Sequence, residues 1–238
     1  MSNLNSRLRR NYKIPLLRLI LALWLAAPAA APAAEDWTPT RVADGLADRY
    51  RQVDSLVAAY RRVATTPATD QLFKSSSRQV ATGVLYWARP DRLRLDQTSP
   101  QPEAMVTDGA TVWWHLPSEN LVYRYRKVNV AGELKPLLSF LGGLATLTRD
   151  FDLAPAQAEP ARPGQRGLRL TPKDGDRSVD HLTVWCDETF TLTGFVLATV
   201  TGETTDFFLT GFAENREVEP TLFTFKIPRG AEVIEEEN

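Results

Sequence analysis

The sequence has very few of the side chains that most often carry enzyme chemistry. Its 238 residues include one cysteine, Cys186, and two histidines, His115 and His181. A single cysteine has no partner for an intramolecular disulfide, and its apolar neighbours Val184 and Trp185 predict a small buried side chain. Histidine is the side chain that exchanges protons near neutral pH, but both histidines stand among hydrophobic residues in predicted strands, which favours structural roles.

Motifs that mark catalytic or metal centres are also absent from the sequence. It contains no nucleophile elbow, no glycine-rich phosphate loop and no group of Cys or His residues at metal-ligand spacing. Acidic runs such as Asp187-Glu188 and Glu235-Glu236-Glu237 are typical of solvated turns and charged ends. We therefore expect a protein that is not an enzyme, with no catalytic residues, no metal and no cofactor.

No apolar run in the sequence reaches the ~20 residues that a membrane-spanning helix needs. The run from Leu16 to Ala27 is about half that length, and Pro28 and Pro32 follow it. Five basic residues accompany it: Arg7, Arg9, Arg10, Lys13 and Arg18. A basic segment, a short apolar core and small residues in this order predict a secretory signal peptide.

The predicted signal peptide covers residues 1–33, because Ala31 and Ala33 satisfy the small-x-small rule for cleavage. No cysteine lies near this junction, so the mature N-terminus lacks the thiol that lipid modification requires. Arg9-Arg10 is too common a pair to indicate the twin-arginine route, and we favour the general secretory route. The protein is thus expected in the periplasm.

Charge is balanced in the whole chain but not in the predicted mature protein. Removing residues 1–33 leaves 23 Lys and Arg against 29 Asp and Glu, a net charge of −6. Nucleic acid and anionic membrane surfaces are therefore unexpected partners. Residues 34–238 have the length of one β-rich domain, which we expect to be monomeric.

The first predicted element of the mature chain is an amphipathic helix that begins at Thr38. Thr38 is a suitable cap and Pro39 suits the first turn. Apolar residues then recur at spacings of three and four, which extends the predicted helix past residue 57: Val42, Leu46, Tyr50, Val53, Val57 and Tyr60. The polar residues of the segment Thr65 to Arg78 predict a loop after it.

Short alternating segments separated by turns follow, which is typical of an antiparallel β-meander. In residues 92–96, for example, Leu93 and Leu95 share one face and the charged residues share the other. Asp108-Gly109 is the strongest hairpin signal. Ten strands are predicted: Val80–Trp87, Arg92–Gln97, Ala104–Thr107, Thr111–Leu116, Leu121–Val128, Gly167–Thr171, Val179–Trp185, Leu192–Thr199, Thr205–Phe212 and Leu222–Ile227. Their number and spacing are typical of a barrel or a sandwich.

Two other segments interrupt the meander. Residues 136–147 are rich in leucine at helical spacing and predict a short apolar helix. Residues 154–165 contain three prolines and predict irregular, extended chain.

Several of these segments together resemble the LolA family of periplasmic lipoprotein carriers. The resemblance lies in residues 82–94, which read TGVLYWARPDRLR, and then in Ser99-Pro100, Met105 to Gly109 and Val112-Trp113. It continues in residues 170–173 and 223–233 and so covers nearly the whole mature chain. No single piece is specific; their order and spacing carry the likeness.

The resemblance implies a mainly β fold: an incomplete, unclosed antiparallel barrel of about ten or eleven strands, with a helical lid over an apolar cavity. It also implies a carrier that takes the acyl chains of lipoproteins from an inner-membrane ABC transporter and hands them to an outer-membrane acceptor. Such a carrier uses no cofactor. Exposing acyl chains to water costs a large amount of free energy, so such a carrier must keep them in an apolar environment.

The resemblance also suggests roles for single residues. Arg89 matches the arginine that hydrogen-bonds to lid backbone and keeps the empty cavity closed; the alternative is an exposed arginine before a turn proline. Candidates for the cavity wall are Trp87, Leu93, Leu95, Trp113, Tyr123 and Phe195. Val42, Leu46, Tyr50 and Val53 would form the underside of the lid. For each wall residue, ordinary core packing is the alternative, because alternation does not show whether a face is filled.

Other functions remain open at the level of the sequence. A LolA-like sensor of lipids or lipoproteins, or a carrier of another envelope lipid, would share the fold. The sensors normally have a second domain, and the acceptor of the same pathway needs a lipidated cysteine. A lipid hydrolase would need a nucleophile and a base that the sequence does not offer. We therefore favour the carrier.

Overall fold

A computed structural model of the 238-residue chain describes residues 37–67, 77–126, 147–157, 159–173 and 178–236. The predicted signal peptide and most of the predicted apolar helix at 136–147 lie outside these ranges. Only Leu147 of that segment is described, as the first residue of helix α3 (Leu147–Asp150). Within the described ranges, no helix is long and apolar enough to cross a membrane.

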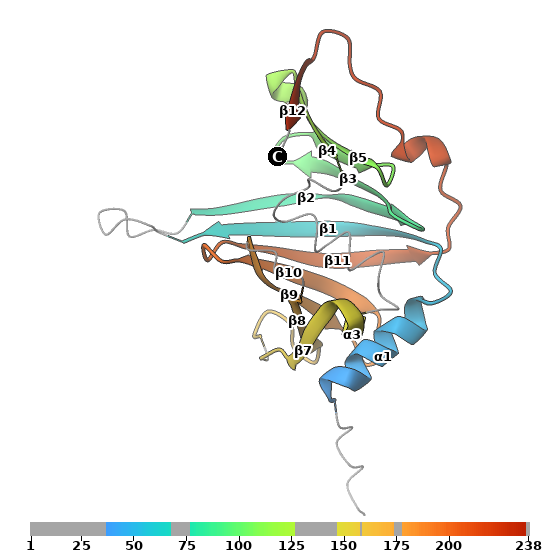
Figure 1. Ribbon diagram of the computed structural model, residues 1–238, viewed down its shortest axis with the longest axis vertical. Coiled ribbons are helices and arrows are strands. Elements are labelled where there is room, and N and C mark those ends of the chain that lie inside the picture. The colour runs from blue at the N-terminus through green and yellow to red at the C-terminus, as the bar shows by residue number, and fades with distance from the viewer. Residues whose placement is uncertain (1–36, 68–76, 127–146, 158, 174–177, 237–238) are drawn as a thin grey trace, which may run out of the picture. The chain divides into compact units, whose positions relative to one another are not determined.

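One large sheet forms the frame of the domain (Figure 1). Its strand order is β12-β6-β5-β4-β3-β2-β1-β11-β10-β9-β8-β7, and all neighbours are antiparallel except the parallel pair β12 and β6. Strands β12 and β7 lie at opposite edges, so the sheet is not closed. This confirms the prediction of a mainly β, incomplete barrel, and the described residues form twelve strands where about ten or eleven were expected.

The connections between successive strands are short between β2 and β6 and between β8 and β11, and longer elsewhere. Their bounds are β1 (Ser55–Thr66), β2 (Ser77–Ala88), β3 (Arg92–Ser99), β4 (Glu103–Thr107), β5 (Thr111–Leu116), β6 (Leu121–Arg126), β7 (Phe151–Pro155), β8 (Arg166–Pro172), β9 (Val179–Cys186), β10 (Leu192–Thr199), β11 (Thr204–Glu214) and β12 (Glu232–Glu236). Two short 3-10 helices complete the described chain: η1 (Pro117–Glu119) and η4 (Pro220–Phe223). Nine of the ten predicted strands are therefore present, each shifted by at most a few residues.

Helix α1 (Pro39–Tyr50) is shorter than predicted. Thr38 caps it as expected, its hydroxyl accepting a hydrogen bond from the Arg41 amide at 3.2 Å. The prediction that the helix continues through Val57 and Tyr60 is wrong, because both residues lie in β1. Strand β1 pairs with β2 on one side and β11 on the other over nearly its whole length, and this long-range pairing overrides the local helical spacing.

The predicted strand Leu222–Ile227 is also wrong. Its first residues form η4, and no described strand pairs with the segment. Its aromatic side chains pack on a face of the sheet instead of alternating across an edge: the Phe225 ring stacks on Trp113 with centroids 6.1 Å apart. We call residues Pro220–Pro228 the C-terminal strap.

Strands extend into the ends of two segments that were predicted to be irregular. Strands β1 and β2 extend into the segment Thr65 to Arg78 by two residues each, so the connection between them covers residues 67–76. The first residues of the segment 154–165 complete β7, which the sequence did not indicate as a strand.

The sheet has an inner face, on which α1 packs, and an outer face. Buried apolar residues of α1 and of the inner face form one core cluster, which includes Leu46, Leu56, Leu85 and Phe195. Helix α1 contacts α3, β7 and β8 at one end of the sheet (Figure 1). The inner face is therefore the one that carries the candidate site.

The outer face is covered by two segments, and the first is the C-terminal strap. Phe223 is 1% exposed, and Arg94 of β3 donates to the Leu222 carbonyl at 3.1 Å. The strap therefore covers the outer side of strands β3 to β5.

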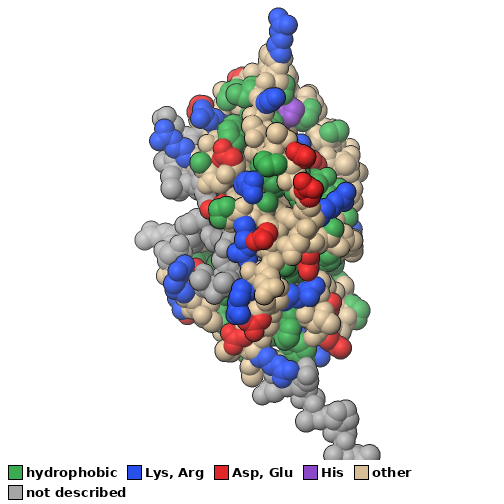
Figure 2. Space-filling view, turned by 90° about the vertical axis from the view of Figure 1, so that its right-hand side faces the viewer, with side chains coloured by type: hydrophobic (Ala, Val, Ile, Leu, Met, Phe, Trp, Pro, Cys, Tyr) green, Lys and Arg blue, Asp and Glu red, His purple; other side chains and the backbone are tan. Residues whose placement is uncertain are grey.

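On the side of the molecule in Figure 2, basic and acidic side chains are interspersed among hydrophobic ones.

The second outer cover follows β7 and is fixed by Arg162. The Arg162 side chain is fully buried between Phe208, 4.1 Å from its ring centre, and Trp185, 5.5 Å away, and it is paired with Asp206. Gly194 makes room for it, since a Cβ there would lie 2.6 Å from Nη1 of Arg162. This arginine ties an otherwise irregular segment to strands β9 to β11.

Candidate functional site

Three of the predicted wall residues lie side by side on the inner face. Trp87 pairs directly with Leu93, and Leu85 pairs directly with Leu95, so strands β2 and β3 present these four side chains together. Trp87 and Leu93 are each 2% exposed and Leu95 is 8% exposed. The alternation that the sequence predicted for Leu93 and Leu95 is thus present in the sheet.

Phe195 reaches the same face from the other half of the sheet. Its ring stacks on that of Phe207 with centroids 4.5 Å apart, and the two residues pair across β10 and β11. Both belong to the core cluster that contains Leu93 and Leu95. Residues about a hundred positions apart in sequence therefore share one apolar surface.

Tyr123 also lies on the inner face, at its less covered end. Strand register connects Leu95 to Met105, Met105 to Trp114 and Trp114 to Tyr123, so all four side chains point to one side. The rings of Trp114 and Tyr123 lie 5.6 Å apart, and both residues are partly exposed. Tyr125 continues this row, with its ring 6.3 Å from that of Tyr123.

Trp113 does not belong to this surface, and its prediction as a wall residue is corrected. It pairs with Val106, which pairs with Arg94, and this register places all three on the outer face beneath the C-terminal strap. The neighbouring Trp114 points inward instead. The sequence shows two adjacent tryptophans, and alternation alone does not decide which one faces the core when both faces are covered.

The predicted lid residues Val42, Leu46 and Tyr50 are buried on α1. The Tyr50 hydroxyl accepts a hydrogen bond from the Leu192 amide at 2.9 Å, and burial raises the pKa of this hydroxyl. Val53 is 3% exposed but lies beyond the end of the helix, in the connection to β1. Its assignment to the helix is therefore corrected, because α1 ends at Tyr50.

Arg89 contacts the backbone at the end of α1. Its Nε donates to the Val53 carbonyl at 2.8 Å, and its Nη2 donates to the Tyr50 carbonyl at 2.8 Å and to the Arg51 carbonyl at 3.4 Å. The last carbonyls of a helix lack partners within the helix and carry partial negative charge, so a guanidinium is well suited to bridge them. This side chain is 36% exposed.

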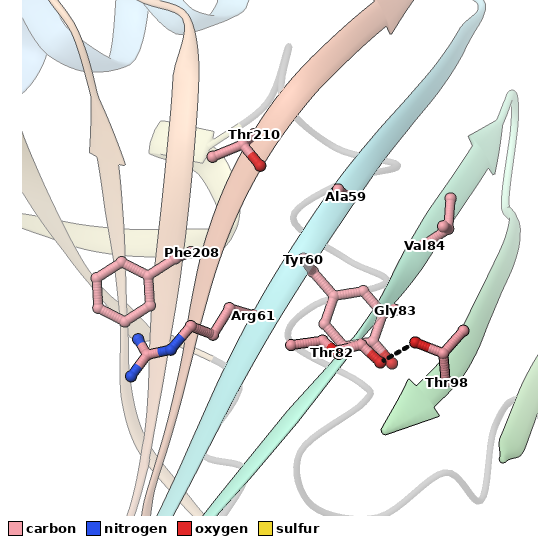
Figure 3. A pocket seen from close by; sticks show the side chains of 9 residues that line it. All are labelled: Ala59, Tyr60, Arg61, Thr82, Gly83, Val84, Thr98, Phe208 and Thr210. Atoms are coloured by element: carbon pink, nitrogen blue, oxygen red, sulfur yellow. Dashed lines mark hydrogen bonds between the residues drawn. The ribbon is translucent and has the colours of Figure 1, made fainter. Parts of the chain in front are cut away.

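Strands β1, β2, β3 and β11 leave a pocket of about 530 Å³ on the outer face, between the two covers. Figure 3 shows its lining, with the Arg61 guanidinium beside Phe208 and a hydrogen bond of 3.1 Å from the Thr98 hydroxyl to the Thr82 carbonyl. None of the predicted wall or lid residues lines it. It is therefore distinct from the inner apolar surface.

The two histidines lie away from the inner surface. His115 packs against Phe225 of the C-terminal strap, with ring centres 5.7 Å apart, and desolvation lowers its pKa. His181 bonds to Asp180 at 2.6 Å and to Arg169 at 3.0 Å. In the part of the chain that the structure describes, no group of three or more His, Cys, Asp or Glu residues is placed to hold a metal ion.

Comparison with known proteins agrees with this arrangement. The profile of the family described as "Outer membrane lipoprotein carrier protein LolA" matches residues 68–226. A protein of Methylibium petroleiphilum is 30% identical over 212 residues, which cover 89% of this chain and 97% of the relative. A protein of Leptothrix cholodnii is 28% identical over 206 residues, covering 85% and 91%. Both relatives are named outer-membrane lipoprotein carrier protein.

Among solved structures, a LolA superfamily protein from Nitrosomonas europaea is 13% identical, with a TM-score of 0.43 over 79% of this chain and 98% of the other. The family profile spans more than half of the sequence, and the Methylibium petroleiphilum relative matches almost from end to end. The chain therefore belongs to the LolA family.

Proposed function

We propose that this protein is a periplasmic carrier that binds the acyl chains of lipoproteins released from the inner membrane and delivers them to an outer-membrane acceptor. The observation that carries the proposal is the apolar inner face of an unclosed sheet, partly covered by α1, in a member of the LolA family. Family members of this kind are named for carrying lipoproteins.

The inner face supplies the surface that an acyl chain needs. Each methylene group removed from water is worth about 0.8 kcal/mol, so a lipid anchor strongly favours an apolar surface over the aqueous periplasm. Trp87, Leu93, Leu95, Tyr123 and Phe195 would contact the chains. The missed residues Met105 and Trp114 extend this surface toward the edge of the sheet.

Arg89 would act as the latch of the empty carrier. Its hydrogen bonds to the carbonyls of Tyr50 and Val53 hold the end of α1 against β2. Entry of cargo beneath α1 would require these bonds to break, and their re-formation would favour release. Transfer then needs no cofactor, because an acceptor with higher affinity for the acyl chains draws them away.

The remaining parts of the proposal concern location and partners. Residues 1–33 would direct export and be removed, leaving residues 34–238 as a monomeric carrier domain without enzymatic activity. An inner-membrane ABC transporter would supply the cargo, and an outer-membrane acceptor would receive it.

Native mass spectrometry of the mature protein, purified from an envelope extract without detergent, tests the proposal. We expect complexes whose added mass is that of acylated lipoproteins. Complexes with phospholipid or glycolipid alone would show a carrier of another lipid. A protein that carries no acylated species under these conditions, and takes up none when lipopeptide is added, would contradict the proposal.

A further inference from the structure

The apolar inner face ends in a group of polar side chains, which we call the polar end: Tyr60 and Arg62 of β1, Gln97 of β3 and Glu103 of β4. Gln97 lies two residues beyond Leu95 on the same side of β3, and Glu103 pairs directly with it. Tyr60 pairs with Gly83, which pairs with Gln97. Four polar groups therefore border a surface that is otherwise apolar.

Small residues of β2 allow this group to form. Ala81 and Gly83 are the inner-face residues of β2 opposite Arg62 and Tyr60. A Cβ at Gly83 would lie 2.7 Å from the Tyr60 hydroxyl oxygen and 2.1 Å from the Asp96 carbonyl oxygen, so only glycine fits. Because the side chains of β2 are so small at these positions, Arg62 can extend across the strand. It donates from Nη2 to Oε1 of Gln97 at 3.0 Å.

Gln97 fixes the orientation of Arg62. It is 7% exposed, and its Nε2 donates to the Gln101 carbonyl at 2.9 Å, so its Oε1 is the atom turned toward the arginine. Among the described residues, this contact occupies one of the five N–H groups of the guanidinium, which leaves donors for a further acceptor. Arg62 itself is only partly buried.

Of the other members of the polar end, Tyr60 can donate to a carbonyl group, whereas the Glu103 carboxylate only accepts hydrogen bonds. Burial raises the pKa of Tyr60 to about 12, so its hydroxyl stays protonated at physiological pH. The Glu103 carboxylate accepts a bond of 3.4 Å from the Trp114 indole N–H, which connects the polar end to the partly exposed aromatic row. Glu103 of β4 therefore lies between the Gln97 side of the polar end and the Trp114 ring of β5.

The distance along β1 agrees with the length of an acyl chain. From Ala58 to Arg62 are four residues, or about 13 Å at ~3.3 Å per residue. The hydrocarbon layer of one membrane leaflet is half of ~30 Å, or about 15 Å. A chain of this length that lies along the strands with its tip near Ala58 and Leu85 would bring its carbonyl group close to Arg62.

We infer that the polar end binds the ester and amide carbonyls through which acyl chains join the terminal cysteine of a lipoprotein. Arg62 is the principal donor, and Gln97 is the residue that positions it. This inference rests on the proposed carrier function and specifies how deep the cargo sits.

Two lipid probes with equal chains test the inference on the purified mature protein. One is a diacylglyceryl-cysteine peptide, and the other is its dialkyl ether analogue, which lacks the ester carbonyls. We expect the wild-type protein to bind the ester probe about tenfold more tightly, since one hydrogen bond to a charged donor is worth about 1.5 kcal/mol or more. Arg62→Leu and Gln97→Leu should bind both probes with the weaker affinity.

Arg61→Leu is the matched control, because Arg61 is the next residue on β1 and is exposed on the outer face. It should keep the wild-type preference for the ester probe. Binding of diphenylhexatriene, an apolar dye, should survive in all variants and shows that the apolar surface is intact.

Equal affinity of the wild-type protein for the two lipid probes would overturn the inference and leave the carrier function standing. The same holds if Arg62→Leu keeps the ester preference. Failure of the wild-type protein to bind either lipid probe or the dye would overturn both proposals. The affinities of the wild-type protein for the ester and ether probes test the inference even if a variant does not fold.

Discussion

At the scale of single residues, Arg89 is the side chain through which the sheet holds the end of α1. Arg89→Leu removes the hydrogen bonds to Tyr50 and Val53, so the closed empty state loses stability relative to the loaded one. We expect onward transfer of a bound lipopeptide to acceptor membranes to slow by roughly tenfold, the effect of about 1.4 kcal/mol. Hydrogen exchange of the α1 amides should also become faster.

Arg51→Leu is the control for this prediction. Its side chain is 68% exposed at the same helix end and pairs only with Asp48 among the described residues, so its loss should leave transfer unchanged. Arg89→Lys keeps the charge but not the planar fork and should give an intermediate rate. Unaltered transfer in Arg89→Leu would remove the latch from the mechanism.

Cys186 gives a second prediction at this scale. It is fully buried on β9, and desolvation, reinforced by the charge of Asp187, raises its pKa to about 12. A thiol reagent at pH 8 should therefore label the protein only after denaturation. Rapid labelling of the folded protein would contradict the burial.

The raised pKa of Cys186 also has a consequence for stability. The thiol is favoured over the thiolate in the folded state, so its contribution is complete below the unfolded value of 9.0 and is lost as pH rises toward about 12. Burial also raises the pKa of Tyr50 and Tyr60, so their contributions to the stability of the fold are lost in an overlapping alkaline pH range. Urea unfolding at several pH values should show a smaller alkaline loss in Cys186→Ala than in the wild-type protein, since both tyrosines remain.

At the scale of elements, the C-terminal strap makes the outer face of β3 to β5 a second core. Phe223 is 1% exposed, and the Arg92 guanidinium lies 5.2 Å from its ring centre. Phe223→Ala should lower the free energy of unfolding by about 3 to 5 kcal/mol, the usual cost of removing a buried phenyl ring. Denaturant titration measures it.

Ile227→Ala tests whether burial is the cause. Ile227 belongs to the same strap but is 51% exposed, so this change should cost less than about 1 kcal/mol. Equal losses in the two variants would indicate that the strap acts through its backbone and not through the Phe223 side chain.

At the scale of the whole molecule, the chain combines a predicted export signal with an open sheet. Expression of the full sequence in a bacterial host should yield a periplasmic protein that begins at Ala34, because Ala31 and Ala33 satisfy the cleavage rule. Intact-mass measurement checks this, and a periplasmic product that retains residues 1–33 would contradict it. Leu23→Arg interrupts the apolar core of the signal and should hold the protein in the cytoplasm.

Much of this architecture is readable from local sequence. Alternation places nine strands, Thr38 marks the start of α1, and Asp108-Gly109 marks a tight turn, where Gly109 has a φ of +98° and the Asp108 carboxylate accepts from two following amides. These features depend on contacts between near neighbours in the chain. The physical preferences that create them therefore appear directly in the order of residues.

Other features were decided only by the tertiary structure, because they depend on partners far away in sequence. Tyr60 has the spacing of a helical residue, yet pairing of β1 with β2 and β11 makes it a strand residue. Trp113 and Trp114 are equivalent in sequence, and only the strap on one face and the core on the other separate their roles. The contact of Arg62 with Gln97 likewise exists only because β2 brings two small residues between them. Local order thus determined nine of the strands, while long-range pairing determined that β1 is a strand and which side chains meet on the inner face.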